Sequence, residues 1–141
     1  MVSYLKEKGI GNQKVLDVFK SVPRHLFLDS TLESHAYEDK AFPIGAEQTI
    51  SHPYTVAFQT ELLQVNSGMK VLEIGTGSGF QTAILIALGA EVYTIERQLE
   101  LYRKCDRHFS IYPPGPKKLI YGDGYKGYLK EAPYDRIIVT A

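Results

Sequence analysis

The sequence has no excess of charge and only one cysteine, and both shortages exclude classes of protein. Its 141 residues include 16 Lys and Arg and 16 Asp and Glu, so the formal net charge is zero. A neutral chain lacks the basic surface that neutralises nucleic-acid phosphates, so we expect no nucleic-acid partner. Because Cys105 is alone and the 4 histidines lack metal-ligand spacing, we expect neither a disulfide nor a metal site.

Long hydrophobic runs are also missing. The chain has no run of about 18 apolar residues, and its N-terminus lacks the apolar core of a secretion signal. Apolar residues still make up 44% and charged residues 23%, as in globular domains. We therefore expect one soluble, cytoplasmic domain that makes no contact with membranes.

The N-terminal section predicts helices joined by irregular segments. Apolar residues recur at helical spacing over 15–19, after the candidate N-cap Asn12, and this helix should end near Pro23. Residues 27–50 lack a steady period, so we expect either a functional loop or a disordered one. A further helix is expected over residues 55–63, where Val56, Phe58, Leu62 and Leu63 are available for burial.

After residue 66 the pattern changes to strands that alternate with helices. Strands are expected over residues 70–74, 91–96, 119–121 and 134–139, and helices over residues 81–88 and 98–108. Such alternation indicates βαβ units and a parallel sheet. We predict an α/β fold of one domain, with a helical N-terminal extension in residues 1–66 and the cofactor-binding core in residues 67–141.

The first of these strands leads into a glycine-rich turn, where backbone amides can approach a ligand. The dinucleotide pattern G-x-G-x-x-G is not met, because Phe80 stands at its third glycine. Glu73 is expected to face the crevice, where it would repel a pyrophosphate and attract a ligand with ammonium and sulfonium groups. S-adenosylmethionine has both groups, so we predict that Glu73, Gly75, Gly77 and Gly79 bind it. The alternative is a glycine turn that serves packing alone.

Two acidic residues follow the next strands in register. Glu96 ends the second strand, 21 residues after the first loop glycine, close to the spacing of about 20 at which an acid binds ribose hydroxyls. Asp123, which Gly124 follows, is placed to accept from an adenine amine. The alternatives are an ion pair of Glu96 with Arg97 or Arg103, and a plain turn role for Asp123.

Several segments carry a likeness to one family. They are Val22–Phe27, Ala36–Asp39, Pro43–Gly45, Gln48–Tyr54, the glycine-rich turn, Gly122–Gly124 and Ala132–Ala141. On these residues, which cover nearly the whole chain, the sequence resembles the protein-L-isoaspartate O-methyltransferases. The resemblance implies a Rossmann-like class I methyltransferase sheet and methyl transfer from S-adenosylmethionine to the free carboxylate of L-isoaspartyl residues in damaged peptides and proteins.

The resemblance also implies roles for single residues. Gln48, Thr49 and Ile50 would belong to a loop that closes over cofactor and substrate. Arg97, which follows Glu96, is also expected to bind the cofactor. Thr140 and Ala141 would begin a loop that contacts the substrate peptide.

Ser51 corresponds to the active-site serine of the family. A carboxylate is already ionised at pH 7 and needs no general base, so its orientation limits the reaction. We therefore predict that the Ser51 hydroxyl positions the carboxylate and does not act as a covalent nucleophile. The alternative for Ser51 is an N-cap of the following helix.

The sequence departs from the family in single residues and in strand number. Glu47 stands where many members have glycine, His52 where glutamine is common and Tyr128 where tryptophan is frequent. The family's sheet has seven strands in the order 3-2-1-4-5-7-6, whereas four are recognised here, so we expect a truncated chain with weak or absent turnover. Its fourth strand would be an apolar edge prone to self-association. The rival interpretations are an inactive cofactor-binding fragment, a different class I methyltransferase and, more distantly, a dinucleotide oxidoreductase.

Overall fold

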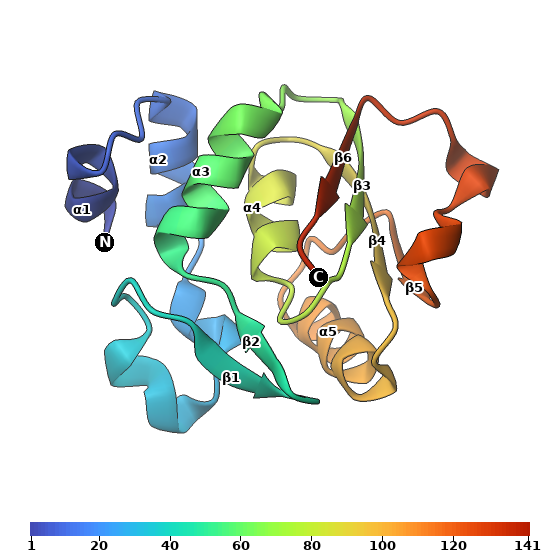
Figure 1. Ribbon diagram of the computed structural model, residues 1–141, viewed down its shortest axis with the longest axis horizontal. Coiled ribbons are helices and arrows are strands. Elements are labelled where there is room, and N and C mark those ends of the chain that lie inside the picture. The colour runs from blue at the N-terminus through green and yellow to red at the C-terminus, as the bar shows by residue number, and fades with distance from the viewer.

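The computed structural model describes all of residues 1–141 and shows a parallel sheet beside an N-terminal section of helices and a hairpin (Figure 1). The helices are α1 (Val2–Glu7), α2 (Gln13–Ser21), α3 (Pro53–Leu63), α4 (Phe80–Ala87) and α5 (Leu99–Ile111). The strands are β1 (Phe42–Gly45), β2 (Gln48–Ile50), β3 (Lys70–Ile74), β4 (Glu91–Glu96), β5 (Lys118–Tyr121) and β6 (Arg136–Val139). Short 3₁₀ helices span Arg24–Phe27, Ser30–His35, Gly124–Lys126 and Leu129–Glu131. No helix combines the length and apolar character needed to cross a membrane.

The main sheet has the order β5-β4-β3-β6, and its neighbouring strands are all parallel. Counted along the main sheet alone, this is the predicted order 3-2-1-4, so the α/β class and the sheet order are confirmed. Central β3 pairs with β4 on one side and with β6 on the other. Consequently the carboxyl ends of these three strands meet at one edge of the sheet, where ligands bind in open α/β sheets.

Alternating residues of β3 and β4 pack on the two faces of the sheet. Val71 and Val92 point to the face covered by α4, where they pack with Leu85. Leu72 and Tyr93 belong to a separate cluster on the opposite face. Burial on both faces explains why these two strands are nearly continuous apolar runs.

The N-terminal helices are joined to the sheet by a shared hydrophobic core. Apolar side chains of α1, α2 and α3 pack with Phe80 and Ile84 of α4. The Asn12 side chain accepts hydrogen bonds from the backbone N–H groups of Lys14 and Val15, which confirms the predicted N-cap. This shared core holds α3 beside the start of α4 and thereby forms one wall of the site described below.

Of the two expectations for residues 27–50, a disordered segment is wrong, because regular structure occupies much of the segment. These residues contain a 3₁₀ helix and the antiparallel hairpin of β1 and β2, in which Phe42 pairs with Ile50. The buried Arg24 supports the segment, because its Nε donates to the Ala36 carbonyl at 2.8 Å. The hairpin turn places Glu47 at a φ of 57°, a left-handed conformation that favours glycine.

Candidate active site

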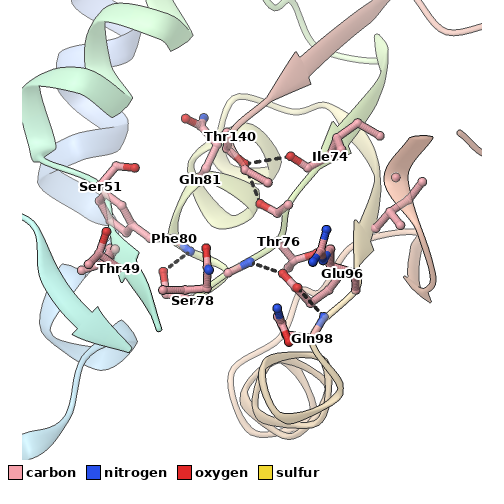
Figure 2. A pocket seen from close by; sticks show the side chains of 18 of the residues that line it. Thr49, Ser51, Ile74, Thr76, Ser78, Phe80, Gln81, Glu96, Gln98 and Thr140 are labelled. Carbon is pink, nitrogen blue, oxygen red and sulfur yellow. Dashed lines mark hydrogen bonds between the residues drawn. The ribbon is translucent and has the colours of Figure 1, made fainter. Parts of the chain in front are cut away.

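A cavity of about 310 Å³ lies at the carboxyl ends of β3, β4 and β6, between the sheet and the hairpin (Figure 2). This volume is at the lower end of the range of small-molecule sites. The lining residues are Gln48, Thr49, Ile50, Ser51, Val56, Gln59, Ile74, Gly75, Thr76, Gly77, Ser78, Phe80, Gln81, Ile95, Glu96, Arg97, Gln98, Gly124, Thr140 and Ala141. They include most of the residues that the sequence indicated.

The glycine-rich turn connects β3 to α4 along the floor of the cavity. Gly75 has a φ of 95°, and a Cβ built there would lie 2.9 Å from the backbone nitrogen of Ala141. Only glycine therefore allows the turn after β3 and the chain after β6 to approach so closely. Gly75 and Gly77 line the cavity, as predicted from the sequence.

Glu96 fixes the turn from the neighbouring strand. Its Oε2 accepts from the Gly77 N–H at 2.8 Å and its Oε1 accepts from the Gln98 N–H at 2.8 Å. Neither Arg97 nor Arg103 forms an ion pair with it, so the ion-pair alternative is wrong. Each carboxylate oxygen can accept a second hydrogen bond, and therefore Glu96 can hold hydroxyl groups of a ligand in the cavity.

Glu73 does not face the cavity, and this part of the prediction is wrong. Its side chain is completely buried beneath the glycine-rich turn, and Oε2 accepts from the Thr82 hydroxyl while Oε1 has no partner. Burial raises the pKa of the Glu73 carboxyl to about 7, against the opposing effect of the hydrogen bond from Thr82. Because side chains alternate along a strand, Glu73 points toward α4, on the same face as Val71.

Two further residues that were predicted to bind the cofactor, Gly79 and Asp123, do not line the cavity. Gly79 is the N-cap of α4, with a φ of 86° and Phe109 packed against it. Asp123 is exposed and accepts from the Tyr125 N–H at 3.0 Å, which corresponds to the plain turn role considered for it. Its neighbour Gly124 does line the cavity, so Asp123 lies at the rim.

Ser51 lies between β2 and α3, on the opposite side of the cavity from Glu96 (Figure 2). The N-cap of α3 is His52, which makes no side-chain capping bond, so the N-cap alternative for Ser51 is wrong. Its hydroxyl has no hydrogen-bond partner within the chain and is available to a ligand. The three residues before it, Gln48 to Ile50, continue the same wall.

Thr140 and Ala141 line the cavity immediately after β6. The Thr140 N–H donates to the Ile74 carbonyl at 2.9 Å, and its Oγ1 lies 2.5 Å from the Gly75 carbonyl oxygen. These bonds tie the segment after β6 to the glycine-rich turn. The Thr140 hydroxyl therefore has a backbone partner, whereas the Ser51 hydroxyl has none.

Several cavity residues were not recognised from the sequence. Thr76, Ser78 and Gln98 each follow or precede a residue that was predicted to bind the cofactor. That position in the sequence could have indicated them. Gln81 had a clearer signal, because it is a large polar residue in the first turn of a mostly apolar helix.

Cys105 is completely buried against the same turn. Its Sγ lies 3.1 Å from the Gly77 carbonyl oxygen, and burial raises the pKa of the thiol to about 12. A thiol in this state is inert and serves packing. No group of three or more His, Cys, Asp or Glu side chains is arranged to hold a metal ion.

Comparison with known proteins matches the whole chain to one family. The family model described as protein-L-isoaspartate(D-aspartate) O-methyltransferase (PCMT) matches residues 1–141. A protein-L-isoaspartate O-methyltransferase of Christiangramia forsetii is 61% identical over 141 residues, which are 100% of this chain and 66% of the relative. One from Chlorobaculum tepidum is 54% identical over 145 residues, again covering 100% of this chain and 66% of the relative. The chain thus spans about two thirds of the length of these curated relatives.

Solved structures show the same likeness. A protein-L-isoaspartate O-methyltransferase aligns with a TM-score of 0.88 and 30% identity, over 99% of this chain and 46% of that one. A Plasmodium falciparum PCMT, in complex with S-adenosyl-L-homocysteine, aligns with a TM-score of 0.81 over 99% of this chain and 71% of that one. Its identity of 22% supports the fold alone.

The sheet order and the glycine-rich turn after β3 define a methyltransferase fold of the Rossmann-like type. With a family model matched along its entire length, the chain belongs to the protein-L-isoaspartate(D-aspartate) O-methyltransferase family.

Proposed function

We propose that this chain uses S-adenosylmethionine to methylate the free carboxylate of L-isoaspartyl residues in damaged peptides and proteins. One observation carries the proposal: a single cavity is lined by the glycine-rich turn and Glu96 on one side and by Ser51 on the other. The first side suits a nucleoside, and the second offers a free hydroxyl to a carboxylate. Family membership supports this reaction over those of other class I methyltransferases.

The residues of the cavity fit S-adenosylmethionine. Glu96 would accept from ribose hydroxyls, and Gly75 and Gly77 would let the backbone approach the ligand. Gln48 to Ile50 and Arg97 would cover the cofactor, with Gly124 and the rim residue Asp123 near its adenine. When bound, the cofactor supplies an electrophilic methyl group on its sulfonium.

Ser51 would donate its free hydroxyl to the substrate carboxylate and hold one oxygen in line with the methyl group. No side chain hydrogen-bonds to Ser51, so nothing in the structure activates it as a nucleophile. The substrate carboxylate is ionised at pH 7 and attacks without a general base. Thr140 and Ala141 would contact the peptide beside it.

The zero net charge of the chain supports a peptide substrate over a nucleic acid.

The proposal predicts selective methyl transfer to isoaspartyl peptide. The assay follows labelled methyl groups from S-adenosylmethionine to a peptide with one L-isoaspartyl residue, and to the same peptide with L-aspartate as control. We expect slow transfer to the first and none to the second. Binding of S-adenosylhomocysteine without any transfer would instead indicate the inactive fragment, and equal transfer to both peptides would contradict the proposed substrate.

We also propose that the 141-residue chain self-associates through β6. This strand pairs only with β3, so its other edge carries unpaired backbone groups, and Ile137 and Val139 on it are 58% and 61% exposed. Light scattering should give a mass above that of the monomer, and Ile137→Lys should return the mass to the monomer value. A wild-type monomer at high concentration would contradict the proposal. We also propose a cytoplasmic location, because a chain whose single cysteine is Cys105 has no internal disulfide of the kind found in secreted domains.

A further inference from the structure

Gln81 is the buried polar residue of the cavity wall whose hydrogen bonds are incomplete. It lies in the first turn of α4, lines the cavity and is only 6% exposed. Its Oε1 is buried and has no hydrogen-bond partner within the chain. In Figure 2 it lies in the part of the cavity that contains Ser51 and Thr140, away from Glu96 and Gln98.

The orientation of the Gln81 amide follows from its neighbour on α3. The Thr60 hydroxyl donates its only hydrogen to the Val56 carbonyl oxygen at 2.7 Å, so toward Gln81 it can only accept. The Gln81 Nε2 therefore donates to Thr60 Oγ1, at 2.9 Å. Consequently the free end of the amide is the Oε1 acceptor, and it cannot exchange places with the nitrogen without losing this bond.

Unpaired buried acceptors are unfavourable, and they persist where another molecule completes them. Two other buried side-chain atoms lack partners, Arg24 Nη1 and Glu73 Oε1, but neither residue lines the cavity. Gln81 thus combines an orphaned acceptor with a position in the cavity wall. An acceptor in this position binds a hydrogen-bond donor of a ligand. Since the ribose hydroxyls are assigned to Glu96, away from Gln81, the donor expected here is an N–H group.

We propose that Gln81 is a ligand-binding residue whose Oε1 accepts a hydrogen bond from an N–H donor of the molecule in the cavity. The inference rests on the proposed function, which supplies two such donors. One is the ammonium of the amino-acid part of the cofactor, and the other is a backbone N–H of the isoaspartyl peptide. Both would lie near Ser51, where methyl group and carboxylate must meet.

The test compares Gln81→Met, which keeps the length of the side chain and removes the amide, with Thr60→Val. The second variant removes the same internal hydrogen bond but keeps the Gln81 acceptor. Calorimetry measures the affinities of S-adenosylhomocysteine and of 5′-methylthioadenosine, which has no amino-acid part. Fluorescence anisotropy measures binding of a labelled isoaspartyl peptide in the presence of S-adenosylhomocysteine, and thermal unfolding checks the fold.

Loss of a hydrogen bond to a charged donor corresponds to roughly tenfold or more in affinity. If the donor is the cofactor ammonium, Gln81→Met should weaken S-adenosylhomocysteine about tenfold and leave methylthioadenosine unchanged. If the donor belongs to the peptide, only peptide binding should weaken. Thr60→Val should have a smaller effect in either case.

The inference is overturned if Gln81→Met binds all three ligands within twofold of the wild type. It is also overturned if Thr60→Val causes the same losses, because the effect would then be structural. A wild-type chain that fails to bind S-adenosylhomocysteine contradicts the proposed function itself, and this is seen before any variant is compared.

Discussion

The free energy of unfolding of this chain is expected to fall by roughly 2–3 kcal/mol as the pH rises from 5 to 8, because of Glu73. The folded pKa of Glu73 is raised from 4.5 to about 7, chiefly by burial. The folded state therefore holds a proton that the unfolded state releases from about pH 4.5 upward, and stability decreases through this window. Well below pH 4.5 the Glu73 carboxyl is protonated in both the folded and the unfolded state, so it no longer makes the free energy of unfolding depend on pH.

The measurement is urea unfolding at several pH values, on the wild type and on Glu73→Gln. The amide is neutral throughout, so the variant should lack this component and become the more stable protein at pH 8. The two proteins should differ little at pH 5. Parallel pH profiles would contradict the idea that Glu73 is buried with a raised pKa.

Replacing Ser51 with alanine is expected to reduce methyl transfer to an isoaspartyl peptide about 100-fold, the scale on which one positioned donor contributes. The free Ser51 hydroxyl has no role in the fold, so the affinity for S-adenosylhomocysteine should stay within about twofold of the wild type, since a hydroxyl that makes no bond contributes little. Initial rates with labelled S-adenosylmethionine measure the first effect, and calorimetry measures the second.

Two variants control for indirect effects at Ser51. Ser51→Thr keeps a hydroxyl and should recover part of the activity, whereas His52→Ala alters an exposed neighbour outside the cavity and should have little effect. Full activity in Ser51→Ala would exclude the positioning role. A parallel loss of cofactor binding would mean that the serine acts on the cofactor, not on the carboxylate.

The sheet could be predicted because its strands are buried on both faces. The apolar runs at 70–74 and 91–96 coincide with β3 and β4, and the family resemblance implied the strand order. The hairpin was missed because Pro43 and a turn without glycine at its centre do not match the usual hairpin pattern.

The burial of α3 was partly mispredicted. Val56 is buried, but Phe58 and Leu62 are 44% and 66% exposed. The sequence shows that an apolar residue is available to pack, but only the arrangement of neighbouring elements decides whether it does.

The sequence predicted the cavity residues well where a motif fixes the backbone, as in the glycine-rich turn. It predicted them less well where the direction of a side chain decides whether the residue lines the cavity. Gly75 and Gly77 line the cavity as expected, and Glu96 holds the turn between them. The prediction for Glu73 was wrong because side chains alternate between the two faces of β3. The Glu73 side chain lies on the face that packs against α4 and is buried there, so it does not reach the cavity. The sequence marked Gln81 only as a polar residue in a mostly apolar helix. Its orphaned acceptor was missed because it depends on the contact with Thr60, which lies on another helix.

A calorimetric titration of the wild-type chain with S-adenosylhomocysteine, and separately with NADH, tests whether the cavity is built for a sulfur-containing nucleoside. We predict saturable binding of S-adenosylhomocysteine and no detectable binding of NADH. Binding of NADH in the absence of binding by S-adenosylhomocysteine would contradict the proposed cofactor and the reaction that depends on it.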